Sequence, residues 1–137
     1  MVDVQWIAEG SQKMSTKPRK NPVQENESNA AVPSERWGRF LEDFSRHHRG
    51  WSARLETYDL DTLENVLSPE APMESIALDL EDEKNPRINV IVHLDNKVVK
   101  HILYRPSLLV LQSADGRNES LRIRTVNTDT TVHVREP

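Results

Sequence analysis

Apolar and aromatic side chains recur at helical intervals between residues 34 and 51. These side chains belong to Trp37, Phe40, Leu41, Phe44 and His48. Their three- and four-residue spacing places them on one face of an α-helix, and charged residues fill the opposite face. Ser34 is suited to cap the first turn, and Gly50 to end the helix in a left-handed conformation. The pattern predicts one amphipathic helix whose apolar face is buried.

The chain after Gly50 alternates between apolar and polar residues, a two-residue period typical of strands with one buried face. Strands are predicted at residues 51–58 and 75–81, and a nearly continuous apolar strand at 107–113 is expected near the centre of a sheet. Residues 59–73 contain leucines at helical spacing but also two prolines. They are therefore predicted to form a loop with at most one helical turn.

The segment 87–104 is predicted to form a β-hairpin. Asp95 and Asn96 tolerate the positive φ angles that a two-residue turn demands. With this turn, the facing pairs on the buried side are Val92 with Val99, Val90 with His101 and Ile88 with Leu103.

A second hairpin is predicted at residues 119–135, with its turn at Asn127 and Thr128. With this turn, Val126 lies opposite Asp129 and the two apolar rows coincide, because a strand presents alternate residues to the same face. The facing pairs are then Leu121 with Val134, Ile123 with Val132, Arg122 with His133 and Arg124 with Thr131.

These elements predict an α+β fold, in which one helix packs on an antiparallel meander of about six strands that can roll toward a barrel. Residues 1–33 are rich in lysine, proline, asparagine, serine and glutamate and show little apolar periodicity. A disordered N-terminal tail is predicted there, followed by a single domain at residues 34–137.

Three motifs occur in a characteristic order along this domain. They are W-x-x-F-x-x-x-F-S-R-x-H-x-G-W at residues 37–51, H-x-x-x-R-P at residues 101–106, and L-R-I-R at residues 121–124. The combination resembles a family of small bacterial proteins known as a domain of unknown function, and the similarity extends from about Ser34 to the C-terminus. The resemblance implies a bacterial origin and a single domain, and it implies no activity.

Composition narrows the range of functions. The absence of cysteine excludes disulfides, thiol catalysis and cysteine-bound metals. A net charge of -4 argues against a protein that holds nucleic acid mainly by neutralising phosphates. The chain has no apolar run long enough to span a bilayer, and its start lacks the pattern of a secretory signal. The cytoplasm is the expected compartment.

His101 is the most interesting of the five histidines. The predicted hairpin places its ring on the buried face beside Val90, where a polar group needs either a hydrogen-bond partner or a cavity. His101 is therefore either a hydrogen-bonded core residue or a contact for a ligand. Arg105, four residues later, is a candidate anchor for an anion.

The last hairpin offers a second candidate site. If Arg122, Arg124 and His133 share the outer face, they form a small positive platform for a phosphate, a carboxylate or an acidic partner. The alternative is a solvated face on which these side chains form cross-strand pairs.

The sequence favours a non-catalytic binding or protein-interaction module of the bacterial cytoplasm, with no catalytic residue, cofactor or metal assigned. One alternative is a small-molecule binder or simple hydrolase, with a pocket between helix and sheet, His101 as base and Arg105 as anion anchor. Another is a weak nucleic-acid contact through the C-terminal arginines. The expected partner is an unidentified protein or a small anionic ligand. No membrane contact is expected, and the sequence is compatible with a homodimer.

Overall fold

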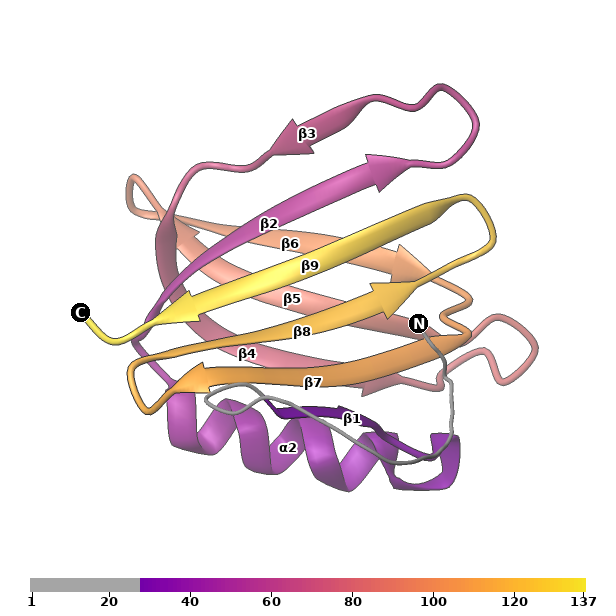
Figure 1. Ribbon diagram of the computed structural model, residues 1–137, viewed down its shortest axis with the longest axis horizontal. Helices are drawn as coiled ribbons and strands as arrows, with labels where there is room; N and C mark the ends of the chain where they lie inside the picture. The colour runs from indigo at the N-terminus through magenta and orange to yellow at the C-terminus, as the bar shows by residue number, and fades with distance from the viewer. Residues whose placement is uncertain (1–27) are drawn as a thin grey trace, which may run out of the picture.

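The computed structural model describes residues 28–137, so most of the predicted N-terminal tail lies outside the described residues. The elements in chain order are β1 (Ser28–Ala31), the 3₁₀ turn η1 (Ser34–Arg36), α2 (Trp37–His48), β2 (Ser52–Asp59), β3 (Asn65–Leu67), β4 (Ala71–Asp79), β5 (Arg87–Leu94), β6 (Lys97–Tyr104), β7 (Leu108–Asp115), β8 (Asn118–Arg124) and β9 (Thr128–Arg135) (Figure 1).

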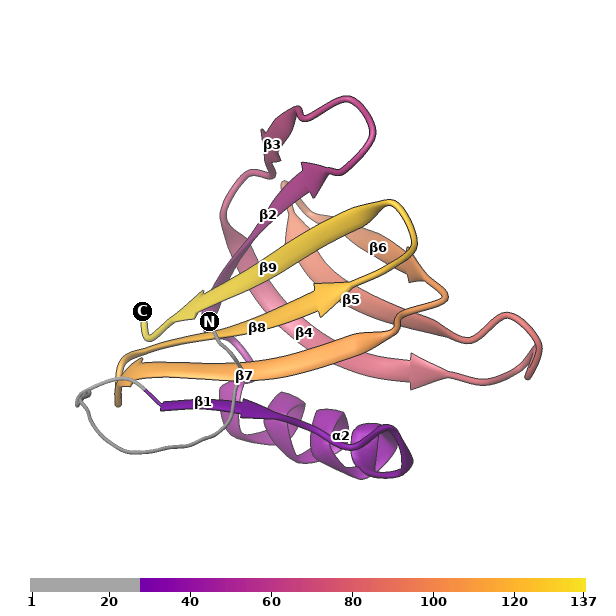
Figure 2. The same cartoon turned by 45° about the vertical axis from the view of Figure 1, so that its right-hand side comes forward.

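The described strands form one antiparallel sheet in the order β1-β7-β8-β9-β2-β4-β5-β6, with β3 added beside β2. Strands β2 and β4 pair only at Ser52 with Pro72 and Ala53 with Ala71. Beyond this corner the sheet separates into two halves, which face each other like the sides of a wedge (Figure 2). The predicted α+β class is confirmed; the described residues hold nine strands where about six were expected, and the sheet does not close into a barrel.

Helix α2 covers the edge of β4 that faces away from β5. The Ser45 hydroxyl donates a hydrogen bond to the Ile76 carbonyl and accepts one from the Ile76 amide, each at 2.7 Å. Gly50, with a φ of 85°, donates its backbone N–H to the Met73 carbonyl at 2.8 Å. Because β2 pairs with only the start of this edge, the helix takes the place of a missing strand along the rest of it.

The predicted apolar face of the helix is confirmed. Trp37, Leu41, Phe44 and His48 are buried, whereas Phe40 is only partly buried. The predicted cap is wrong, because Ser34 belongs to the 3₁₀ turn and no side-chain hydrogen bond caps the start of either helical segment.

His48 fixes the end of the helix to the opposite half of the sheet. Its Nδ1 lies 2.7 Å from the Phe44 carbonyl, and its Nε2 lies 2.8 Å from a Glu119 carboxylate oxygen on β8. The ring also stacks on Phe44 and meets the Trp51 ring edge-on. These contacts hold the ring between α2 and β8.

The hairpin of β5 and β6 is confirmed with its predicted register. Asp95 and Asn96 form the turn with φ angles of 53° and 65°. The facing pairs are those expected, namely Val92 with Val99, Val90 with His101 and Ile88 with Leu103.

Other strand predictions are corrected by the structure. Residues 28–31, placed in the tail by their composition, form β1 beside β7. The predicted loop at 59–73 contains β3, and β4 already begins at Ala71. The two prolines of this segment do not prevent the strands, because Pro69 lies before β4 and Pro72 lies where the ladder needs no N–H donor. The apolar strand β7 lies next to β1, near one end of the sheet and not at its centre.

The last hairpin is also shifted by two residues from the predicted register. Its observed facing pairs are Leu121 with Val132, Arg122 with Thr131, Ile123 with Thr130 and Arg124 with Asp129. A two-residue shift leaves every side chain on its original face, so the alternation of the sequence does not distinguish the two registers. The longer connection at residues 125–127 decides between them.

Candidate functional site

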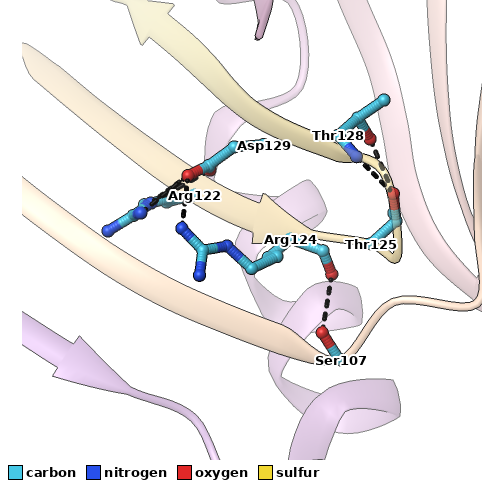
Figure 3. A network of polar contacts seen from close by, with 6 residues as sticks. All are labelled: Ser107, Arg122, Arg124, Thr125, Thr128 and Asp129. Atoms are coloured by element: carbon cyan, nitrogen blue, oxygen red, sulfur yellow. Dashed lines mark hydrogen bonds and ion pairs between the residues drawn. The ribbon is translucent and has the colours of Figure 1, made fainter. Parts of the chain in front are cut away.

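The predicted arginine platform is largely neutralised by Asp129. Arg122 donates through Nε and Nη2 to the Asp129 carboxylate at 2.6–3.1 Å, and Arg124 donates to the same group at 3.1 Å (Figure 3). Burial of Asp129 opposes its ionisation, but the hydrogen bonds from the two arginines outweigh this effect and lower its pKa. The three side chains therefore form a cross-strand cluster whose main contacts are internal.

Replacing Asp129 with alanine should lower the free energy of unfolding at neutral pH by about 1–2 kcal/mol. Hydrogen bonds to charged groups contribute about 1.5–3 kcal/mol, and solvent reduces the value here because both arginines are more than a third exposed. Chemical denaturation measures the change, with the exposed Asp61→Ala as control.

The pH dependence gives the same prediction a second test. Because the folded-state pKa of Asp129 is lowered, its contribution is present above the ordinary carboxyl pKa of about 3.9 and is lost as pH falls through the lower folded value. The Asp129→Ala variant should therefore lose less stability than the wild type between about pH 5 and pH 2. If the free energy of unfolding falls by the same amount in both proteins over this pH range, this account is contradicted.

His133 lies apart from the two arginines. Its Nε2 is 3.1 Å from the Glu56 carboxylate on β2, and Asn65 on β3 donates to the same carboxylate at 3.0 Å. The Asn65 and His133 side chains lower the pKa of Glu56 by hydrogen bonding to it. The structure thus places Arg122 and Arg124 together but pairs His133 with a different acid.

His101 borders a cavity of about 350 Å³ at the separated end of the two half-sheets. One wall consists of residues 101–104 of β6. The opposite wall comes from β2, from β3 and the residue after it, from the connection between β8 and β9, and from the start of β9. Its residues are Leu55, Thr57, Val66, Ser68, Thr125, Asn127, Thr128 and Thr130. We call this cavity the β6 opening.

Hydroxyl groups define the polar side of the β6 opening. The Thr57 and Thr130 hydroxyls lie 3.2 Å apart, and the Thr125 and Thr128 hydroxyls lie 2.7 Å apart. The Thr128 amide also donates to the Thr125 hydroxyl, which fixes the connection between β8 and β9 (Figure 3). Thr130 is fully buried and Thr125 nearly so, so the threonine hydroxyls that a ligand could reach are those of Thr57 and Thr128, and the wall carries no formal charge.

The His101 ring is half-buried at the edge of the β6 opening. Within residues 28–137, no hydrogen bond joins it to another side chain or to the backbone, and burial lowers its pKa. An uncharged imidazole can both donate and accept a hydrogen bond. His101 therefore contributes a polar contact to the opening, without a neighbouring group that would orient it as a catalytic base.

Exposed apolar side chains surround the β6 opening. Val66 and Tyr104 line it and are 61% and 58% exposed, and Val126 at the neighbouring turn is 80% exposed. The Leu60 amide donates to the Asn127 carbonyl at 2.9 Å, which holds the connection after β2 against the same turn. We call Val66, Tyr104 and Val126 the apolar rim. Apolar side chains gathered around a cavity are typical of binding surfaces.

The remaining predicted positions lie elsewhere. Arg105 is exposed just after β6, has a φ of 53°, and does not line the β6 opening. No residue of α2 lines the opening either, so His101 is not in a pocket between helix and sheet. A depression of about 520 Å³ does lie between α2 and residues 31–33, but it contains none of the predicted site residues.

Sequence reasoning missed the hydroxyl wall of the β6 opening. Its clearest signal is Thr130, a fully buried threonine that lies opposite Ile123 of β8 and precedes the buried Val132 on the same face of β9. With the incorrect register of the last hairpin, Thr130 faces no apolar residue of β8, and the burial of its hydroxyl cannot be recognised.

Two properties of the described part of the chain concern membranes and metals. None of its helices has the length and hydrophobicity needed to cross a bilayer. Nor do residues 28–137 bring three histidine or acidic side chains together in a way that could hold a metal ion.

The fold and the opening define a small α+β protein with one helix on an open antiparallel sheet. The chain belongs to a family of unknown function, DUF5335, whose model matches residues 28–137. The matched region begins with β1 and therefore includes residues that the sequence analysis assigned to the tail. Comparison with curated proteins and with solved structures finds no match.

Proposed function

We propose that this protein is a non-catalytic binding module whose partner or ligand occupies the β6 opening. The observation that supports this proposal is the position of the apolar rim around a cavity with an uncharged, hydroxyl-rich wall. Its volume lies at the lower end of the range of about 300–1,000 Å³ that is common for ligand sites. The bacterial cytoplasm is the compartment we propose, because the chain has no cysteine for the disulfides that many small secreted domains use.

The chemistry of the opening supports binding over hydrolysis. A hydrolase needs a base that a second group orients, and an electrophilic or anion-binding group close to it. His101 has no such orienting group among the described residues, and Arg105 lies outside the opening. The internal pairing of Arg122 and Arg124 with Asp129 likewise weakens the alternative of a nucleic-acid contact.

A fragment titration followed by two-dimensional NMR tests this proposal. A library of small, uncharged polar fragments is added to the isotope-labelled full chain. We expect amide shifts to concentrate on residues 101–104 of β6, on Thr57 and on the 125–130 segment. Shifts concentrated around Arg122 and His133 would contradict the proposal and favour an anion site on the outer face.

A pair of tryptophan substitutions provides the matched control. Val66→Trp places a large ring at the edge of the opening and should abolish the fragment shifts there, because Val66 lines the cavity and is exposed. Leu80→Trp places the same ring at an exposed site that does not line the cavity, and should leave the shifts unchanged. Equal effects of the two substitutions would count against the β6 opening as the site.

A further inference from the structure

Strand β6 borders the opening with its edge. It pairs with β5 on one side and with no other described strand. Four consecutive residues, 101–104, line the cavity. Since successive side chains of a strand point to opposite faces, four consecutive lining residues mean that the backbone edge itself faces the cavity.

The register of the hairpin identifies the backbone groups on this free edge. The Arg105 amide donates to the Pro86 carbonyl at 2.8 Å, just beyond the end of the ladder. Hydrogen-bonded and non-hydrogen-bonded pairs alternate in an antiparallel ladder, so this bond sets their order. The backbone groups directed away from β5 are then those of Val98, Lys100, Ile102 and Tyr104.

The two faces of β6 differ in chemistry. Val99, His101 and Leu103 lie opposite the buried residues of β5 and face inward. The outward residues are Val98, Lys100, Ile102 and Tyr104. A strand added to this edge would place alternate side chains beside Leu103 and His101 and the others beside Lys100.

The charges along the edge of β6 indicate which side chains a partner strand should carry. Lys97 and Lys100 are exposed on β6, and Arg105 is exposed immediately after it. Pairing of β6 with a second copy of itself in antiparallel orientation would bring lysines close to lysines, which is unfavourable. An acidic side chain at an outward position of a partner strand would instead complement Lys100, whereas Lys97 lies at the start of β6 on the other face.

We propose that β6 binds an extended segment of a partner protein by strand addition, with acidic residues on its outward side and small apolar residues directed into the β6 opening. This inference rests on the function proposed above and specifies the class of partner. Backbone hydrogen bonds to the free edge would supply affinity, and the alternating side chains would supply selectivity.

Fluorescence anisotropy with two labelled synthetic peptides tests the inference. One peptide alternates valine and glutamate, the other alternates valine and lysine, and proline at both ends limits the aggregation of each. We expect the full chain to bind the glutamate peptide at least about tenfold more tightly than the lysine peptide, because Lys100 attracts glutamate and repels lysine at the same outward position. Equal affinity for both peptides, or no binding of either, would overturn the proposal.

Charge reversal on β6 provides the decisive variant. Lys97→Glu combined with Lys100→Glu should reverse the preference between the peptides without altering the fold, because both side chains are exposed. Lys84→Glu combined with Arg117→Glu changes the same net charge at exposed positions outside β6 and should leave the preference unchanged. The same loss in both double variants would show attraction by overall charge and would refute strand addition.

A backbone substitution separates this inference from the proposed function. Ile102→Pro removes an amide donor from the free edge and leaves the hydrogen bonds to β5, a position at which edge strands tolerate proline. It should abolish peptide binding, with circular dichroism as the measure of folding. If fragments bind in the opening but the glutamate peptide does not bind the wild type, strand addition is wrong and the proposed binding function stands.

Discussion

Replacing Phe44 with alanine should lower the free energy of unfolding by about 3–5 kcal/mol, the usual cost of removing a buried phenylalanine. Phe44 is only 6% exposed, and its ring stacks on His48 with the centroids 4.1 Å apart. The substitution would leave a cavity at the centre of the contact between α2 and the sheet. It would also remove the ring that holds His48 in reach of Glu119.

Phe40→Ala is the matched control for this prediction. Phe40 lies one turn earlier on α2, with its ring centroid 6.1 Å from that of Phe44, but it is only partly buried. The same chemical change should therefore cost clearly less stability. Urea denaturation of both variants measures the difference, and equal losses would contradict the assigned orientation of the helix.

Replacing Ser45 with alanine should lower the free energy of unfolding by at least about 2 kcal/mol. The Ser45 hydroxyl satisfies both the amide and the carbonyl of Ile76, and these groups are buried beneath α2. Removing the hydroxyl leaves two backbone groups without a partner, and each such group costs about 1–3 kcal/mol. The effect is large for the loss of a single oxygen because the helix replaces a strand at this edge.

Ser107→Ala is the corresponding surface control. The Ser107 hydroxyl also donates to a backbone carbonyl, that of Arg124, but it is exposed and the bond is long at 3.3 Å. Its removal should change stability by about 0.5 kcal/mol or less. If the two serine variants lose the same stability, water replaces the Ser45 hydroxyl and the helix does not satisfy the edge of β4 in the way described.

Local patterns predicted the helix and the first hairpin well, for clear physical reasons. The face of α2 follows from the spacing of Trp37, Leu41 and Phe44, which only a helix brings together. The register of β5 and β6 follows from a two-residue turn, because Asp95 and Asn96 permit only one pairing of the adjacent apolar rows. Both predictions depend on residues close to one another in the sequence.

The errors arise where the structure depends on distant segments or on equivalent patterns. β1 has no apolar periodicity of its own and becomes a strand through pairing with β7, more than seventy residues later in the chain. The last hairpin has two registers that place the same residues on the same face, and the length of the turn decides between them.

The candidate site could be predicted only in part. The position of His101 on the inward face of β6 follows from the sequence, and the structure places it there. The cavity beside it is formed by β2, β3, β6, the connection after β8 and the start of β9, which are far apart in the sequence. It exists because β2 and β4 separate after two facing pairs, and no local pattern of residues encodes that separation.

Amide hydrogen exchange of β6, resolved by residue, tests the open edge most directly. In the free protein, the amides of Val98, Lys100 and Ile102 should exchange rapidly, whereas those of Val99, His101 and Leu103 should be protected by β5. Addition of the valine–glutamate peptide should slow exchange at the first three amides. Protection of all six amides in the free protein, or unchanged exchange with the peptide bound, would contradict strand addition at β6.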